Sequence, residues 1–282
     1  MPHPTPPRTR LFSAAAGALA LLIALSGCSL IEPETTSEVV GTEEGPSTVE
    51  DDELGELTVY EVDEAGDLVP AASGIDLEVW EMFREVITPE FAAERILWYQ
   101  VGDNADSDFL AWVIESDEDP ELWNLAVNLA GAEDRDLLLL TLIHEYAHLL
   151  SMGPGQTDES GDCEAEMASA ACTDDGAYLA DYHARFWAGY GDEATAYNGS
   201  DEEDVAAFYE AYEDDFVSEY AATNLGEDFA EVFTAFVGEP QPTDPGASVV
   251  AEKISYMWEQ PELVEIRDRL RAEFGDITWV EY

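Results

Sequence analysis

The fold is decided by residues 137–150, Leu-Leu-Leu-Leu-Thr-Leu-Ile-His-Glu-Tyr-Ala-His-Leu-Leu. As a helix, this stretch is apolar nearly all round, which is typical of a helix inside a core rather than on a surface. Asp134 and Asp136 provide an acidic first turn, and Gly153-Pro154 provides a stop. The pattern therefore predicts a buried helix between these signals.

Two histidines and a glutamate interrupt this apolar helix at a spacing that suits a metal ion. His144 and His148 are one helical turn apart, so both imidazoles lie on one face and can reach the same ion. Glu145 points beside them, where its carboxylate could take a proton from a water molecule at the metal. This is the H-E-x-x-H pattern of zinc metallopeptidases. The alternative is a pair of core histidines hydrogen-bonded to neighbours, with Glu145 as an ion-pair partner.

A catalytic zinc needs a third protein ligand, and it does not come from the residues just after His148. Metzincins continue with a glycine and a later histidine, but Ser151 and Pro154 occupy those positions here. His183 is the only other histidine after the leader. It lies in an amphipathic helical pattern over 178–187, where a lone histidine is usually a surface or hydrogen-bonded residue.

A better candidate lies in a second helix, predicted from Glu227 to Val237 and largely buried. Glu227 and Glu231 share one face of it, and a buried carboxylate pair needs a cation or strong donors nearby. We expect Glu227 to be the third zinc ligand and Glu231 to hydrogen-bond a ligand imidazole from behind. The alternative is that Asn224 caps the helix and Glu227 closes a capping box. Tyr220, about two turns before Glu227, could donate a hydrogen bond to an oxyanion.

Together, these motifs carry a family resemblance. The H-E-x-x-H helix followed by Tyr-x-x-Thr-Asn-x-x-Glu-x-Phe-Ala-Glu-x-Phe resembles the catalytic domain of anthrax lethal factor and its relatives, including the secreted Pro-Pro endopeptidases. These are gluzincin-type zinc endopeptidases, and the resemblance covers about 134–153 and 218–238. It implies the following roles: His144, His148 and Glu227 bind zinc, Glu145 is the base, Tyr220 assists the oxyanion, and Glu231 supports a ligand.

One departure from the family is the length of chain between His148 and Glu227, about 79 positions. The extra segment holds Cys163 and Cys172, the two cysteines beyond Cys28. An even pair in an exported protein predicts a short-loop disulfide. Two free thiols or two metal ligands are the alternatives. The insertion could form a wall or lid of the cleft.

The front of the chain is typical of a bacterial lipoprotein leader. Residues 1–27 hold a basic segment with Arg8 and Arg10, followed by an apolar run that is short for a bilayer span. The run ends in Leu-Ser-Gly-Cys28, which resembles the lipobox, in which the cysteine is acylated. We expect a signal peptide over 1–27 and a lipid on Cys28 that holds the protein at the extracytoplasmic face of the cell membrane. The alternative is an uncleaved membrane anchor.

Composition divides the rest of the chain into two parts. Residues 28–55 are rich in Glu, Thr, Ser, Gly and Pro, and they predict a disordered acidic tether. Residues 56–282 are long enough for one metallopeptidase-like domain.

We expect an α+β fold of zincin type: a small mixed sheet in the part up to about 153, the active-site helix, and a mostly helical remainder. The expected strands are 96–101, 109–115 and 123–129, and the other expected helices are 76–86, 247–258 and 260–273.

The strand predicted at 123–129, just before the metal helix, is a candidate for docking a peptide substrate by β-augmentation. An ordinary core strand is the alternative.

The chain carries 64 acidic residues against 10 basic ones, a formal net charge of −54, and loss of the leader removes only bases. Such a surface repels nucleic acid, which argues against a nucleic-acid partner.

The sequence therefore predicts a monomeric, membrane-anchored zinc endopeptidase that acts on a peptide or protein substrate. A non-catalytic zinc-binding surface lipoprotein is the alternative, because it would share every ligand and differ only in turnover. A metal-free acidic envelope lipoprotein is a third class, and it predicts no stoichiometric zinc.

Overall fold

A computed structural model describes residues 45–158, 172–173, 176–194 and 202–280 of the chain. The predicted signal peptide and the acylation site Cys28 lie outside these residues. So does Cys163, and with it the predicted disulfide to Cys172. No helix within the described ranges combines the length and the hydropathy needed to cross a bilayer.

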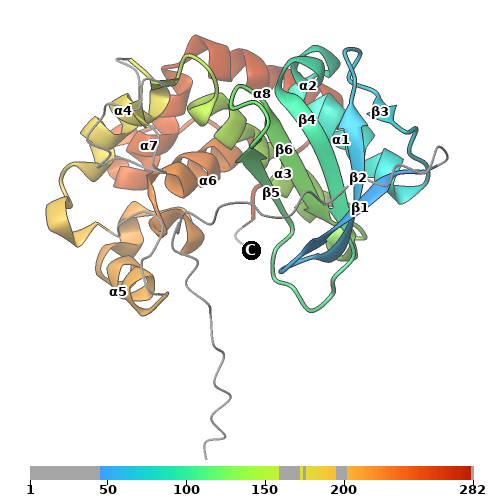
Figure 1. The fold of residues 1–282 in the computed structure, drawn as a ribbon. Coiled ribbons are helices and arrows are strands. Elements are labelled where there is room, and N and C mark those ends of the chain that lie inside the picture. Colours follow the sequence, from blue (N-terminus) through green and yellow to red (C-terminus); the bar gives the residue numbers. More distant parts are fainter. Residues whose placement is uncertain (1–44, 159–171, 174–175, 195–201, 281–282) are drawn as a thin grey trace, which may run out of the picture. The chain divides into compact units, whose positions relative to one another are not determined.

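The described residues form an α+β fold around a sheet of six strands (Figure 1). Strand order is β1-β2-β4-β6-β5, with β3 pairing on β2. All pairs are antiparallel except β4 with β6, so the sheet is mixed, as predicted. The strands are β1 Ser47–Asp51, β2 Gly55–Val62, β3 Leu68–Val69, β4 Ile96–Gly102, β5 Ala111–Glu115 and β6 Trp123–Asn128, and a separate hairpin joins β7 Thr157–Asp158 to β8 Cys172–Thr173.

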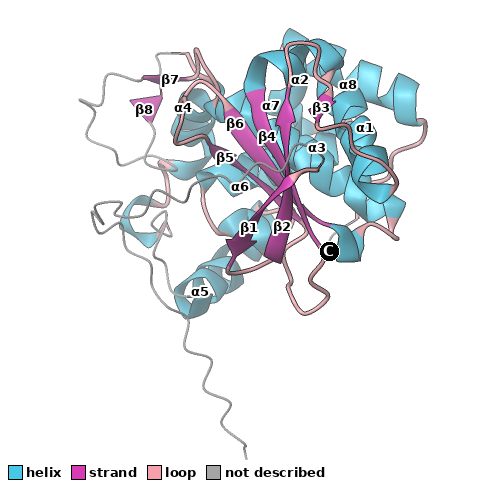
Figure 2. Ribbon diagram, turned by 45° about the vertical axis from the view of Figure 1, so that its right-hand side comes forward, coloured by secondary structure: helices cyan, strands magenta, loops and turns pink. Residues whose placement is uncertain are grey.

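Helices pack beside this sheet and make up most of the described chain after residue 152 (Figure 2). The α-helices are α1 Ile75–Ile87, α2 Pro89–Arg95, α3 Arg135–Met152, α4 Tyr178–Tyr182, α5 Glu202–Tyr212, α6 Leu225–Gly238, α7 Val249–Trp258 and α8 Pro261–Phe274. A π-helical turn, His183–Trp187, continues α4, and short 3-10 turns lie at Leu129–Gly131, Gly191–Glu193, Glu213–Asp215, Tyr220–Ala222 and Pro245–Ala247. The strands and helices predicted from periodicity are confirmed to within a few residues.

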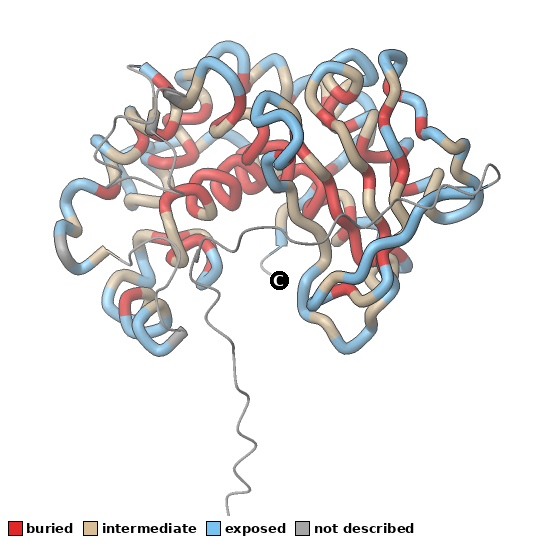
Figure 3. The backbone as a smooth tube through the Cα atoms, in the orientation of Figure 1, coloured by how far each residue is buried: buried red, intermediate tan, exposed pale blue. Residues whose placement is uncertain are grey.

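Helix α3 carries the H-E-x-x-H motif, and its ends follow the signals in the sequence. The Asp134 carboxylate accepts a hydrogen bond from the Leu137 N–H at 3.1 Å and so caps the first turn. The helix ends at Met152, directly before Gly153. Buried residues run along α3 and along its neighbour α6, so this helix pair lies in the core (Figure 3). The two helices therefore form a fixed frame for the polar side chains between them.

Helix α6 is held at its C-terminal end by arginines of α8. The last carbonyls of a helix have no partner inside it, and cations suit that end of the helix dipole. Arg267 donates from Nε to the Phe236 carbonyl at 2.8 Å, and Arg271 donates from Nη1 to the Val237 carbonyl at 2.9 Å. These basic side chains bind main-chain oxygens, which fixes the helix that carries Glu227.

A fully buried ion pair joins α6 to α7. Lys253 Nζ lies 2.7 Å from Asp228 Oδ2, and both side chains are wholly shielded from solvent. The ammonium also donates to the Asp215 carbonyl at 2.7 Å, and the Trp187 indole N–H donates to Asp228 Oδ2 at 2.7 Å. The carboxylate next to Glu227 in sequence is therefore bonded to two other segments of the chain and, through Lys253, linked to a third.

Two predictions about the first half of the chain are wrong. The sheet begins at Ser47, so the disordered tether cannot extend to residue 55 as predicted. Strand β1 is exposed and acidic, and it is held by pairing with β2 rather than by burial, so its sequence gives no apolar period. The strand at 123–128 is paired on both sides, with β4 and with β5, so it has no free edge for a substrate. The edge strand beside α3 is β5.

Candidate metal centre

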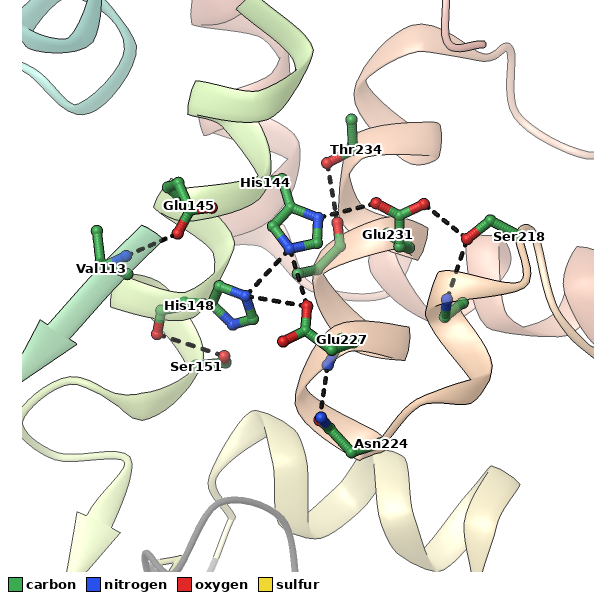
Figure 4. Close-up of polar contacts among 12 residues, drawn as sticks. Val113, His144, Glu145, His148, Ser151, Ser218, Asn224, Glu227, Glu231 and Thr234 are labelled. Carbon is green, nitrogen blue, oxygen red and sulfur yellow. Dashed lines mark hydrogen bonds and ion pairs between the residues drawn. The ribbon is translucent and has the colours of Figure 1, made fainter. Parts of the chain in front are cut away.

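Helices α3 and α6 bring two imidazoles and one carboxylate together (Figure 4). His144 Nε2 lies 3.0 Å from Glu227 Oε2 and 3.1 Å from His148 Nε2, and His148 Nε2 lies 3.3 Å from the same carboxylate oxygen. Each residue thus presents one potential ligand atom to a common point. We call these three residues the metal triad.

The spacing of the metal triad fits zinc. With ligand bonds of about 2.0–2.1 Å, neighbouring ligand atoms of a tetrahedral zinc lie roughly 3.3–3.4 Å apart. The observed separations of 3.0, 3.1 and 3.3 Å are close to the edges of one face of that tetrahedron. The donor set, two imidazole nitrogens and a carboxylate oxygen, is one that catalytic zinc sites use, and it leaves the fourth position open. The group can hold a metal ion, and its chemistry suits zinc.

A carboxylate behind His144 fixes the orientation of the imidazole. Glu231, which is almost fully buried, places Oε1 2.9 Å from His144 Nδ1. When Nδ1–H donates to this carboxylate, Nε2 keeps its lone pair and points toward the other two ligand atoms. The Ser218 hydroxyl donates to the second oxygen of Glu231 at 2.7 Å. The His144 ring is thus held on the side opposite Nε2, its potential ligand atom.

Contacts within the metal triad shift the pKa values of His144 and Glu227 in opposite directions. Burial alone would lower the pKa of His144, but hydrogen bonds to Glu227 and Glu231 raise it well above its usual value. Burial would raise the pKa of Glu227, yet the two imidazoles hold it below its usual range. Without a metal the site therefore favours an imidazolium beside a carboxylate. A dication at the same point would displace that proton, because a ligating histidine must be neutral.

Glu145 lies beside the metal triad and contacts the edge strand. Its Oε2 accepts a hydrogen bond from the Val113 N–H of β5 at 2.9 Å. Burial raises the pKa of Glu145 to about 7, although His148 and His144 oppose the shift. A carboxylate with a pKa near neutrality can both take and return a proton, which is what a general base needs.

Tyr220 completes the group from the side of the 3-10 turn before α6. Its ring centroid lies 5.8 Å from that of His144, and about half of its surface is exposed. Desolvation and the negative charges of Glu227, Glu145 and Glu231 raise the pKa of Tyr220. The phenol therefore keeps its proton and can act as a hydrogen-bond donor.

The metal triad, Glu145 and Tyr220 line a pocket of about 180 Å³. Its other walls are the edge strand β5 with the residues before it, and the end of α3. Phe109 and Trp112 meet edge-to-face there, with ring centroids 6.0 Å apart. Met152, the last residue of α3, also lines the pocket. The pocket thus joins a polar centre to an apolar wall.

Two alternatives from the sequence can now be placed. His183 lies in the π-helical turn, outside the metal triad. Asn224 does cap α6, since its side chain accepts the Glu227 N–H at 3.0 Å, but the Glu227 carboxylate contacts the imidazoles. The cap and the predicted ligand are therefore compatible.

Two residues of the site were missed by sequence reasoning, namely Val113 and Ser218. Val113 contributes a backbone N–H, which carries no side-chain signature. Ser218 stands two residues before Tyr220, where the quoted motif begins, and a serine at that point could have been recognised as a cap of the following turn. Its contact with Glu231 depends on the packing of the turn on α6.

Comparison with models of protein families, with curated proteins and with solved structures finds no match to this chain.

Proposed function

We propose that this protein is a zinc-dependent endopeptidase of the gluzincin type, with a zincin-like catalytic domain similar to that of anthrax lethal factor. The observation that carries the proposal is the metal triad, whose three ligand atoms lie within 3.3 Å of one another beside a buried glutamate with a pKa near neutrality. His144, His148 and Glu227 would hold the ion.

A bound zinc ion would supply Lewis acidity, polarising a water molecule and the scissile carbonyl. Glu145 takes the proton of the attacking water and passes it to the leaving amine. The Val113 N–H holds one oxygen of Glu145, so that carboxylate has a fixed direction. Tyr220 donates a hydrogen bond to the oxyanion, and Glu231 keeps His144 in the tautomer that can bind metal.

The edge strand β5 supports a peptide substrate. Along an antiparallel edge strand, alternate residues direct their backbone groups away from the sheet. The Val113 N–H points to Glu145 rather than to β6, so Ala111 and Val113 face the free edge next to the metal triad. An extended peptide can pair with the outward backbone groups of Ala111, as in β-augmentation, while the Val113 N–H stays with Glu145. This role replaces the one that the sequence suggested for residues 123–129.

The walls of the pocket favour a class of substrate. Phe109 and Trp112 offer apolar surface beside the metal triad. Together with the net charge of −54, this favours neutral or cationic peptides with a large apolar side chain near the cleaved bond. We propose that the protein acts as a monomer anchored by a lipid on Cys28 at the extracytoplasmic face of the membrane, with no nucleic-acid partner.

Incubation of the purified protein with a diverse peptide library and zinc tests this function. We expect cleavage that a chelator abolishes and that added zinc restores, with apolar residues enriched next to the cut and acidic residues depleted. Zinc binding without any cleavage across the library would contradict the proposal. That outcome would favour a non-catalytic zinc-binding surface lipoprotein.

A further inference from the structure

The Ser218 hydroxyl makes two hydrogen bonds that lead to different parts of the proposed active site. It donates to Glu231 Oε2 at 2.7 Å, and it accepts the Ala221 N–H at 3.0 Å. The first bond leads through Glu231 to the His144 imidazole. The second closes the 3-10 turn Tyr220–Ala222, which carries the phenol. One buried oxygen thus contacts both the support of a metal ligand and the turn that presents Tyr220.

The surroundings of Ser218 give its hydroxyl a single arrangement. The residue is 3 % exposed, so water cannot easily replace either partner. The backbone N–H uses a lone pair of the oxygen, which leaves the hydroxyl proton for Glu231. Glu231 in turn holds His144 Nδ1 with its other oxygen, 2.9 Å away. Ser218 therefore orients the Glu231 carboxylate, and Glu231 orients the His144 imidazole.

The segment that carries Ser218 is also fixed from the other side. Lys253 donates to the Asp215 carbonyl, three residues earlier, and its ammonium lies 4.0 Å from the centre of the Phe216 ring. The residues just before Ser218 are thus bound to a buried lysine, and Ser218 itself is bound to the carboxylate of Glu231. Because both the backbone before Ser218 and its hydroxyl are bonded, Ser218 can fix the orientation of the Glu231 carboxylate.

We propose that Ser218 is a positioning residue of the metal centre, which sets the Glu231–His144 contact and the turn of Tyr220 together. The proposal rests on the proposed zinc site and deepens it. Loss of the Ser218 hydroxyl would remove a hydrogen-bond donor to Glu231 Oε2 and the acceptor of the Ala221 N–H. Groups behind metal ligands typically change metal affinity by about 10- to 100-fold when they are removed.

Ser218→Ala is therefore expected to weaken zinc binding about 10-fold, the lower end of that range, because Ser218 acts on His144 through Glu231. Competition with a chromophoric chelator measures the effect. Ser218→Thr, which keeps a hydroxyl, should recover part of the affinity. Ser255→Ala is the matched control, because among the described residues that hydroxyl bonds only the Ala251 carbonyl on α7, at 2.6 Å. It should bind zinc like the unaltered protein.

Double variants separate positioning from general damage. Ser218→Ala combined with Glu231→Gln should weaken zinc binding no more than Glu231→Gln alone, because both changes break one chain of contacts. Equal zinc affinity of Ser218→Ala and Ser255→Ala, both folded by circular dichroism, would overturn the proposal. A wild-type protein that binds no zinc would instead refute the proposed function. If Ser218→Ala does not fold, Ser218→Cys takes its place, because a thiol is a much weaker hydrogen-bond donor, and the same equality with Ser255→Ala would overturn the proposal.

Discussion

Glu145→Gln is expected to lower kcat/KM for peptide cleavage about 10²- to 10⁴-fold while the protein still binds zinc. The amide keeps the size of the carboxylate and can still accept the Val113 N–H, so the pocket keeps its shape. It cannot take a proton from water, so the proposed base is lost. The change should also leave the metal triad in place, because Glu145 provides none of its three ligand atoms.

Cleavage of a peptide identified in the library measures this loss, and metal content measured on the same sample shows that zinc is retained. Glu133→Gln is a matched control, since Glu133 is exposed and precedes α3. It removes the same charge and should leave the activity close to that of the unaltered protein. Full activity in Glu145→Gln would refute the proposed role of this residue.

Lys253→Met is expected to lower the free energy of unfolding by about 3–5 kcal/mol. The ammonium is wholly buried and pairs with the Asp228 carboxylate at 2.7 Å. Removing it leaves a buried negative charge without its partner, and it also removes the donor to the Asp215 carbonyl. Burial raises the pKa of Asp228, and the Lys253 ammonium opposes this shift by stabilising the ionised carboxylate.

Denaturant unfolding followed by circular dichroism measures this effect. Adding Asp228→Asn to Lys253→Met should restore much of the loss, because no uncompensated charge then remains and the amide oxygen can still accept from Trp187. Arg135→Met removes an exposed cation at the start of α3 and should change stability by less than about 0.5 kcal/mol. A Lys253→Met variant as stable as Arg135→Met would contradict the account of this pair.

The sequence could predict the parts of the site that depend on spacing within one helix. The step from His144 to His148 and the step from Glu227 to Glu231 each cover one turn, and each pair does share a face. The apolar residues around both pairs also predicted burial. These are local properties, so a single sequence carries them.

The parts that depend on tertiary packing could not be predicted in this way. Val113 reaches Glu145 only because β5 is the edge strand, and edge position depends on strand order. The sequence placed the docking strand at residues 123–129, because that strand comes directly before α3. In the structure it is paired on both sides, between β4 and β5. Strand β1 was missed because pairing, not burial, stabilises it.

The central claim is that His144, His148 and Glu227 together hold a zinc ion. Metal analysis of the purified protein after dialysis, beside a His144→Ala/His148→Ala variant, tests it most directly. We predict one zinc per chain in the unaltered protein and almost none in the variant, with circular dichroism confirming that both are folded. An unaltered protein without zinc after exposure to the metal, or a variant that retains it, would contradict the claim.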